Sequence, residues 1–224
     1  MTVASSVQNN QLSGMRGGQA IEIDRCDIYQ PQRALVANNF VQIGEGTEDA
    51  TGLRINYGDR FDVVFNTINI TSVNQNNEAF YHYQTNDVIV LNNNFSTHSG
   101  YAYYSSTTSD ITESNHNNIF SNTDLAYWDG AISDLISLQA ASGLDSNSIS
   151  ENPYFPTDTN YQVVQVSLNN AGTPFAGIAY DIEGEPRDAT TPDIGADEFI
   201  PTGTDAGLIA VTTPAKPFSP GFTL

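Results

Sequence analysis

A repeat built on asparagine constrains the fold of this chain more than any other feature of its sequence. The pattern Asn-x-apolar occurs five times, with the apolar residues 28, 28, 27 and 24 positions apart. Units of this length that carry short β-rich segments, with no helix between them, are typical of a parallel β-solenoid. The five matches are Asn10-Gln11-Leu12, Asn38-Asn39-Phe40, Asn66-Thr67-Ile68, Asn93-Asn94-Phe95 and Asn117-Asn118-Ile119.

Five asparagines, one from each unit, are predicted to form a structural ladder. Asparagine tolerates the left-handed backbone conformation that a tight bend between strands requires. Its amide can donate to one neighbouring coil and accept from the other, so a stack of amides satisfies itself. This role is favoured over ligand binding by the same side chains. The predicted ladder residues are Asn10, Asn38, Asn66, Asn93 and Asn117.

A later strand-like segment in each unit alternates between apolar residues and polar or tyrosine residues. Because neighbours along a strand point to opposite faces, one column of residues is predicted to lie inside the solenoid and the next outside. The inner column reads Ile21, Leu53, Phe80, Ala102 and Ala126. The outer column reads Glu22, Arg54, Tyr81, Tyr103 and Tyr127.

The repeat ends after Trp128, and a different series of motifs follows. Residues 133–143 combine a capping residue, apolar positions at helical spacing and a terminal glycine, which predicts one short helix. The later motifs are Gly143-Leu144-Asp145-Ser146-Asn147-Ser148, Asp181-Ile182-Glu183-Gly184-Glu185-Pro186-Arg187 and Pro192-Asp193-Ile194-Gly195-Ala196-Asp197-Glu198-Phe199.

This order of motifs resembles the C-terminal end of bacterial right-handed parallel β-helix repeat proteins, which share the pectin-lyase-like fold. In that family the last coils are followed by a short helix, a D-x-x-G-x-P-R turn and a closing P-D-I-G-A-x-E segment. The resemblance covers about residues 1–200 and departs at Asp197, where the family often has an aromatic residue. It implies an all-β chain that forms a right-handed parallel β-helix (solenoid) with one short helix near the C-terminal end.

Two regions are predicted along the chain. Residues 1–200 are expected to form the parallel β-helix with its closing segment. Residues 201–224 are expected to be a linker and the first strand of a following immunoglobulin-like module, which residues 205–214 resemble. Because a lone strand cannot bury its apolar face, and because no helix caps the first coil, the chain is interpreted as an excerpt of a larger protein.

The charge balance excludes some partners. Seven Lys and Arg residues stand against 26 Asp and Glu residues, giving a formal net charge of −19. Nucleic-acid binding depends on neutralising phosphates with basic side chains, so no nucleic-acid partner is expected. No run of about 18 apolar residues is present, so direct membrane insertion is not expected either.

The resemblance also raises the possibility of catalysis, because some enzymes of the pectin-lyase-like fold cleave polysaccharides. The resemblance implies lyases that use an arginine beside carboxylates, whereas hydrolases need a pair of carboxylates as acid and base. Arg54 falls beside Glu22 in the outer column, which is more simply an ion pair between coils. None of the local signatures of those enzymes is present. The chain is therefore predicted not to be an enzyme, with a polysaccharide lyase or glycoside hydrolase as the alternative.

Two ligand sites are hypothesised. Asp181, Glu183 and Glu185 alternate before Arg187 and could offer oxygen ligands to calcium, although Arg187 could instead pair with one of them and stabilise the turn. No other cofactor is expected. The column Tyr81, Tyr103 and Tyr127 could form a platform on which sugar rings stack, or could simply be packing across strands.

The sequence thus predicts a non-catalytic structural and adhesive module of a large secreted protein. Its expected location is extracellular and associated with the cell surface, and the resemblance suggests export by a type IX-like route. The expected partners are neighbouring modules of the same longer chain, extracellular glycans and other cell-surface proteins. A spacer that binds no ligand is a third alternative.

Overall fold

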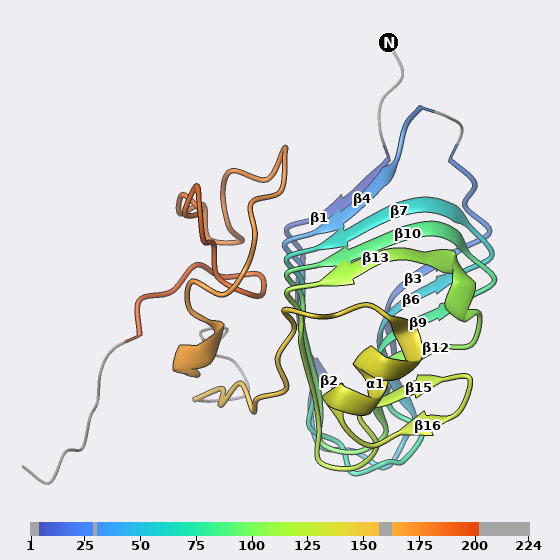
Figure 1. The fold of residues 1–224 in the computed structure, drawn as a ribbon. Coiled ribbons are helices and arrows are strands. Elements are labelled where there is room, and N and C mark those ends of the chain that lie inside the picture. The colour runs from blue at the N-terminus through green and yellow to red at the C-terminus, as the bar shows by residue number, and fades with distance from the viewer. Residues whose placement is uncertain (1–4, 29–30, 157–162, 202–224) are drawn as a thin grey trace, which may run out of the picture.

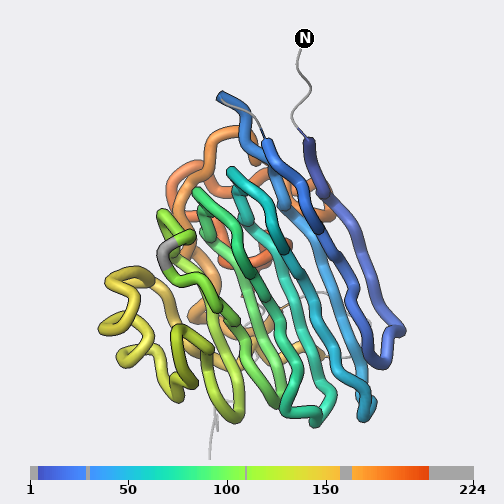
Figure 2. The backbone as a smooth tube through the Cα atoms, turned by 90° about the vertical axis from the view of Figure 1, so that its right-hand side faces the viewer, coloured from blue at the N-terminus to red at the C-terminus, as the bar shows by residue number. Residues whose placement is uncertain are grey.

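The chain folds into a parallel β-solenoid, as the sequence predicts. The computed structural model describes residues 5–28, 31–156 and 163–201. Each coil contributes one strand to each of three sheets, and equivalent strands of successive coils pair in parallel. Figures 1 and 2 show the coils side by side from the N-terminus to the helix near the C-terminal end. The predicted immunoglobulin-like strand lies outside the described residues.

The three sheets are named A, B and C in the order in which the chain enters them. Sheet A contains β1 (Ser6–Gln8), β4 (Ala34–Ala37), β7 (Asp59–Val64), β10 (Asn86–Leu91) and β13 (Ile111–Asn115). Sheet B contains β2 (Gln11–Met15), β5 (Phe40–Ile43), β8 (Thr67–Ile70), β11 (Asn94–Thr97) and β14 (Asn118–Ser121). Sheet C contains β3 (Gly18–Asp24), β6 (Ala50–Asn56), β9 (Glu78–Tyr83), β12 (Tyr101–Ser105), β15 (Ala126–Trp128) and the antiparallel β16 (Ala131–Ile132).

The interior is filled by aligned apolar side chains from all three sheets. In sheet B, Val41 pairs with Ile68, which pairs with Phe95, and all three are fully buried. Full burial of one such side chain contributes about 1.5–3 kcal/mol. Repetition of this column in every coil makes the apolar core a continuous stack along the solenoid.

The inner column of sheet C differs from the prediction at one coil. Tyr103, and not Ala102, pairs with Phe80 and Ala126, and the Tyr103 side chain is fully buried. The predicted alignment of Tyr103 with the outer column is therefore wrong. Because strand side chains alternate between faces, a slip of one residue moves a side chain from the surface to the core.

The predicted helix is confirmed as α1 (Leu135–Ser142), and it covers the C-terminal end of the coils (Figure 1). The Ser137 backbone N–H donates to Asp134 Oδ1 at 2.8 Å, which caps the first turn. Gly143 ends the helix with φ of 71°, a left-handed conformation that glycine adopts without a Cβ clash. The described residues also contain two short 3₁₀ helices, η1 (Thr108–Asp110) and η2 (Val166–Leu168).

Residues 163–201 form a closing segment that lies along one side of the solenoid (orange in Figure 1). It has little regular structure of its own apart from η2. Some of its apolar residues pack in a separate small cluster that includes Val163, Leu168, Ile194 and Phe199. Others, Phe175 and Ile178, pack in a cluster with coil residues Ala37, Val64, Phe65 and Leu91, so apolar packing as well as polar contacts connects the segment to the coils.

Candidate functional site

The asparagine ladder runs in one direction through the whole solenoid. Each ladder residue donates from Nδ2 to the Oδ1 of the next, at distances of 2.8, 2.8, 2.9 and 3.1 Å along the stack. Each accepting Oδ1 also receives the backbone N–H of the preceding ladder residue. The amide dipoles are therefore aligned, an arrangement in which hydrogen bonds strengthen one another. The residues that form it are Asn10, Asn39, Asn66, Asn93 and Asn117.

The sequence prediction is wrong at the second coil, where Asn39 takes the place assigned to Asn38. Both residues of this doublet precede an apolar residue in the required way, so the pattern alone does not separate them. The pairing of Phe40 with Thr67 decides the register and aligns Asn39 with Asn66. Asn38 has φ of 51° and its side chain points toward the closing segment instead.

The ladder ends at a buried carboxylate. Asn117 Nδ2 donates to Asp145 Oδ1 at 3.2 Å, and the hydroxyls of Ser114 and Ser148 donate to the same oxygen at 3.0 and 2.6 Å. Asp145 is 1% exposed, and this burial raises its pKa. The donor end of the aligned amides thus faces an anion, which is the favourable orientation for both.

A second column lies directly before the ladder in the sequence and holds the closing segment. In every coil the residue before the ladder asparagine has φ between 51° and 58°, so its side chain leaves the corner between sheets A and B. Asn92 donates to Thr173 O and accepts from Thr173 N, both at 2.8 Å, and His116 Nδ1 lies 2.9 Å from Ala171 O. The corner column consists of Asn9, Asn38, Phe65, Asn92 and His116.

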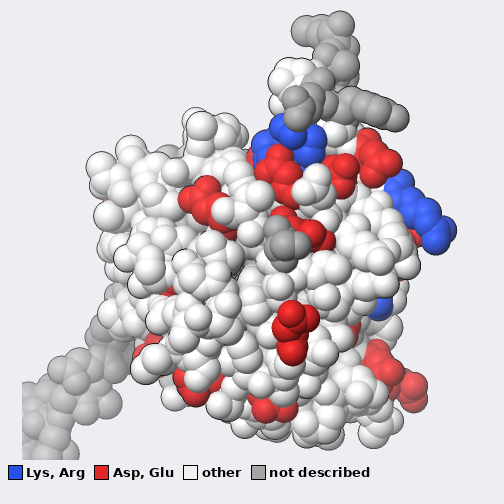
Figure 3. Space-filling view, turned by 45° about the vertical axis from the view of Figure 1, so that its right-hand side comes forward, with Lys and Arg blue, Asp and Glu red and all other residues white. Residues whose placement is uncertain are grey.

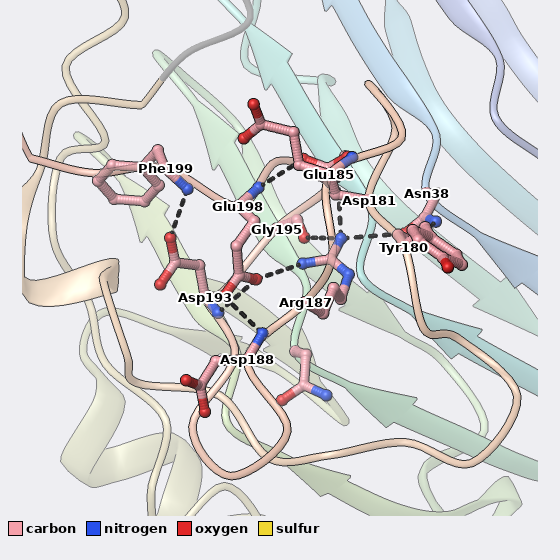
Figure 4. Close-up of polar contacts among 12 residues, drawn as sticks. Asn38, Tyr180, Asp181, Glu185, Arg187, Asp188, Asp193, Gly195, Glu198 and Phe199 are labelled. Carbon is pink, nitrogen blue, oxygen red and sulfur yellow. Dashed lines mark hydrogen bonds and ion pairs between the residues drawn. The ribbon is translucent and has the colours of Figure 1, made fainter.

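Arg187 is the main connection between the closing segment and this corner column (Figure 4). Its guanidinium lies 4.0 Å from the centre of the Phe65 ring and donates to Asn38 Oδ1 at 3.0 Å. The same group donates to the carbonyl oxygens of Gly195 and Ala196, each at 3.0 Å. Arg187 is 8% exposed, and burial lowers its pKa, so its partners hold a desolvated cation in place.

The three calcium candidates do not form a shared site. Asp181 Oδ1 accepts the backbone N–H groups of Glu183 and Glu185 at 2.9 and 2.7 Å, and its Oδ2 accepts that of Glu198. The side chains of Glu183 and Glu185 are exposed. Among the described residues, no three acidic, histidine or cysteine side chains converge as metal ligands. Asp181 therefore stabilises the turn, and the ion-pair partner of Arg187 is Glu198, at 3.3 Å.

Asp197 introduces a pH dependence into the closing segment. It is 6% exposed, and its Oδ2 is buried with no hydrogen-bond partner among the described residues. Burial, together with the nearby charges of Asp181 and Glu183, raises the pKa of Asp197 to about 8. A carboxyl whose pKa is raised by folding stabilises the fold when protonated. Its contribution is complete below about pH 4 and declines as the pH rises to about 8.

Replacement of Asp197 with asparagine is therefore expected to stabilise the protein at pH 8 by about 1–2 kcal/mol, because the variant removes a buried charge beside Asp181. At pH 4 the two proteins should unfold at nearly the same denaturant concentration. Urea unfolding curves from pH 4 to 9 measure this difference. The prediction would be contradicted if the stability of the variant, measured relative to that of the parent chain, were lower at pH 8 than at pH 4.

The outer face of sheet C carries a stack of tyrosines that differs from the predicted platform. Tyr104, and not Tyr103, lies between Tyr81 and Tyr127, with ring centres 4.9 and 4.6 Å apart and interplanar angles of 18° and 9°. The guanidinium of Arg54 lies 4.0 Å from the centre of the Tyr81 ring and extends the stack. Since the rings cover the faces of one another, most of what they present to solvent is edges and hydroxyl groups.

A groove of 570 Å³ lies beside this stack, over the first coils of sheet C. Burial raises the pKa of Glu78, which accepts from Thr51 Oγ1 at 3.2 Å. The amide of Gln19 lies between Glu22 and Arg54, because its nitrogen donates to the Glu22 carboxylate at 2.7 Å and its oxygen accepts from Arg54 Nη1 at 3.0 Å. The predicted pair of Glu22 and Arg54 is therefore linked through this amide. The groove is lined by Gly18, Gln19, Asp49, Thr51, Arg54, Gln75, Asn76, Glu78, Tyr101 and Tyr104.

A charge network that the sequence did not indicate connects successive coils at sheet A. Arg33 pairs with Asp62 at 2.5 Å and with Asp87 at 2.7 Å, and Arg60 pairs with Asp87 at 3.1 Å. The hydrogen bond from Arg33 lowers the pKa of Asp87. In the space-filling view, acidic groups are spread over the face and the basic groups at its top adjoin acidic ones (Figure 3). Arg33 and Arg60 therefore connect successive coils through ion pairs.

Fold and site together define this chain as a parallel β-solenoid whose coils are joined by polar and aromatic stacks. A scan of protein-family models and searches among curated proteins and solved structures found no match. Within residues 5–28, 31–156 and 163–201, no helix has the length and apolar character needed to cross a bilayer.

Proposed function

We propose that the chain is a non-catalytic structural and adhesive module of a large secreted protein that binds extracellular glycans along sheet C. The observation that carries this proposal is the continuity of the stacks through successive coils. The asparagine ladder and the stack of Arg54, Tyr81, Tyr104 and Tyr127 cross-link the coils along the axis. Such a repeated pattern of nearest-neighbour contacts favours a stiff rod that holds binding surfaces apart.

The proposal places the chain among bacterial right-handed parallel β-helix proteins with the pectin-lyase-like fold. The closing motifs support this assignment, and the contacts of Asp181 and Arg187 supply a physical reason for two of the motif positions. Export by a type IX-like route, a cell-surface location and an adjoining immunoglobulin-like module belong to the same proposal. Determination of the full-length gene would test them together, because an export signal and further modules would be visible in it.

The groove on sheet C is the proposed glycan site. Its lining is dominated by amides, carboxylates and hydroxyls, which match the alternating donors and acceptors of sugar hydroxyl groups. The ring of Tyr101 stands across the stack, at 67° to Tyr104 and 76° to Tyr127, so it bounds the groove as an aromatic wall. This arrangement supports hydrogen bonding along a sugar chain more than stacking on the rings of Tyr81, Tyr104 and Tyr127.

A glycan array probed with the purified chain tests this site. Replacement of Tyr101 or Gln75 with alanine is expected to weaken binding about tenfold, since loss of one aromatic or amide contact costs on the order of 1 kcal/mol. Tyr180 to alanine is the matched control, because Tyr180 is 60% exposed and lies on the closing segment. Failure of the parent chain to bind any glycan would favour the spacer that binds no ligand, whereas equal binding by all three variants would place the glycan site outside this groove.

The alternative function is a polysaccharide lyase or glycoside hydrolase. One observation favours it, since Arg54, Glu78 and Asp49 line the same groove and the raised pKa of Glu78 suits a general acid. Against it, Asp49 Oδ1 accepts from Asn74 and Asn76 at 2.9 and 3.1 Å, and Arg54 is held in the tyrosine stack. New reducing or unsaturated chain ends that the parent chain generates and the Glu78→Gln variant does not would establish the enzyme.

A further inference from the structure

The groove beside the tyrosine stack carries more carboxylates than cations. Its charged lining residues, within the part of the chain that the structure describes, are Asp49, Arg54 and Glu78. A second hollow shares Asp49 with the groove, and Arg16 and Glu48 line that hollow as well. Among these lining residues, three carboxylates therefore stand against two guanidinium groups.

The positive charge of Arg54 is held by the protein itself. Its guanidinium lies 4.0 Å from the centre of the Tyr81 ring, Nη1 donates to Gln19 at 3.0 Å, and Nε donates to Asn56 Oδ1 at 3.4 Å. Among the described residues, no ion pair joins Arg54 to either carboxylate of the groove. The arginine therefore belongs to the tyrosine stack, and the two carboxylates keep their charge for a ligand.

Each of the two carboxylates also keeps one oxygen for a ligand. Glu78 Oε2 accepts from Thr51 Oγ1 at 3.2 Å, and Asp49 Oδ1 accepts from two asparagine amides at 2.9 and 3.1 Å. Within the described residues, no donor reaches Glu78 Oε1 or Asp49 Oδ2. Burial raises the pKa of Glu78, Thr51 and Arg54 oppose this rise, and the charge of Asp49 adds to it. The two carboxylates thus repel one another across the groove, and a cation between them would remove that repulsion.

The aromatic wall of the groove also favours a cation. Tyr101 meets Tyr104 and Tyr127 at 67° and 76°, so its ring is not stacked on either of them. Burial raises the pKa of Tyr101, and the negative charge of Asp124 adds to this rise. An aromatic ring with carboxylates nearby attracts an ammonium group through both the ring and the charges.

We infer, on the basis of the proposed glycan binding, that the groove selects glycans whose sugars carry free, protonated amino groups. Asp49 and Glu78 are the selecting residues, because the ammonium group donates to Asp49 Oδ2 and Glu78 Oε1 in charge-assisted hydrogen bonds. The amides of Gln75 and Asn76, which line the same groove, bond the neighbouring hydroxyl groups. A sugar acid is rejected, since its carboxylate would face two like charges.

Calorimetric titration of the purified chain with three hexasaccharides tests this selectivity. The probes are hexamers of glucosamine, N-acetylglucosamine and galacturonic acid, in a buffer in which the amine is protonated. The glucosamine hexamer is expected to bind about tenfold more tightly than the neutral N-acetylglucosamine hexamer, because a charge-assisted hydrogen bond is stronger than a neutral one. Added salt should narrow this difference, and the galacturonic acid hexamer should bind most weakly.

Two variants locate the selectivity in the groove. Glu78→Gln and Asp49→Asn should each reduce the preference for the glucosamine hexamer by about threefold or more, since each removes one charge and keeps the side-chain shape. Glu113→Gln is the matched control, because Glu113 is exposed on β13 of sheet A and does not line the groove. The control should keep the preference of the parent chain.

Each contrary result has its own meaning. Equal binding of the glucosamine and N-acetylglucosamine hexamers, tighter binding of the galacturonic acid hexamer, or an unchanged preference in both groove variants overturns the inference and leaves glycan binding in place. A lysine hexamer that binds as tightly as the glucosamine hexamer overturns it in favour of a protein partner. Binding of none of the three sugars also overturns it, and the glycan array then shows whether glycan binding fails as well.

Discussion

Replacement of Arg187 with alanine is expected to detach the closing segment and to lower the free energy of unfolding by about 3–5 kcal/mol. Loss of one member of a buried charged network leaves its partners desolvated without compensation. Here the partners are Asn38 Oδ1, the carbonyl oxygens of Gly195 and Ala196, and the carboxylate of Glu198. Urea denaturation measures the loss of stability, and limited proteolysis within residues 163–201 measures the detachment.

Two further variants make this test specific. Arg187→Lys keeps the charge but lacks the planar fork that reaches several acceptors, so it should recover less than half of the stability. Arg25→Ala is the control, because the Arg25 side chain is 75% exposed and its closest carboxylate is 3.8 Å away. Its effect should stay below about 0.5 kcal/mol. Equal protease resistance of the Arg187→Ala variant and the parent chain would show that Arg187 does not hold the segment.

Replacement of Asn66 with alanine is expected to cost about 3–4 kcal/mol, since it breaks the ladder at its centre. Its Nδ2 donates to Asn93 Oδ1 and Val36 O, both at 2.9 Å, and its Oδ1 accepts two N–H groups of Asn39. Alanine leaves buried donors and acceptors of neighbouring coils unpaired, and each such group costs about 1–3 kcal/mol. The midpoint of thermal or urea unfolding measures the effect.

The matched control is Asn10→Ala at the N-terminal end of the same ladder. Asn10 is exposed and makes only part of the bonds of an interior ladder residue, so the expected loss is at most about 1 kcal/mol. Comparison of the two variants separates the ladder from the intrinsic effect of asparagine on a turn. Equal losses at the two positions would refute a cooperative ladder.

The closing segment shows where sequence reasoning reached its limit. The motif predicted a turn at Asp181 and a stabilising role for Arg187, and both residues are buried in that region. The sequence pattern predicted that Arg187 pairs with Asp181, Glu183 or Glu185. In the structure its ion-pair partner is Glu198, and its guanidinium also donates to the amide of Asn38. Asn38 lies 149 positions away, and no local spacing rule relates residues at that distance.

The same limit applies to Tyr104 and Asn39. In each case two adjacent residues of one type satisfied the repeat, and the prediction chose the wrong member. The choice between two adjacent residues decides whether a side chain lies on the inner or the outer face of a strand, or whether it belongs to the ladder or to the corner column. The residue directly before each ladder asparagine has positive φ, but Asn9, Asn38, Phe65, Asn92 and His116 share no residue type, so this signal is visible only in the structure.

The sequence by itself determined that this chain forms stacked β coils with an asparagine in each coil, followed by a helix and a closing segment. Those features depend on local periodicity, turn chemistry and capping, all of which neighbouring residues specify. Only the tertiary structure decided that Asn39 and Tyr104 belong to the stacks and that Arg187 joins the closing segment to Asn38. These features depend on register between coils, which is set by backbone hydrogen bonds between residues about 23–31 positions apart and by loops of unequal length.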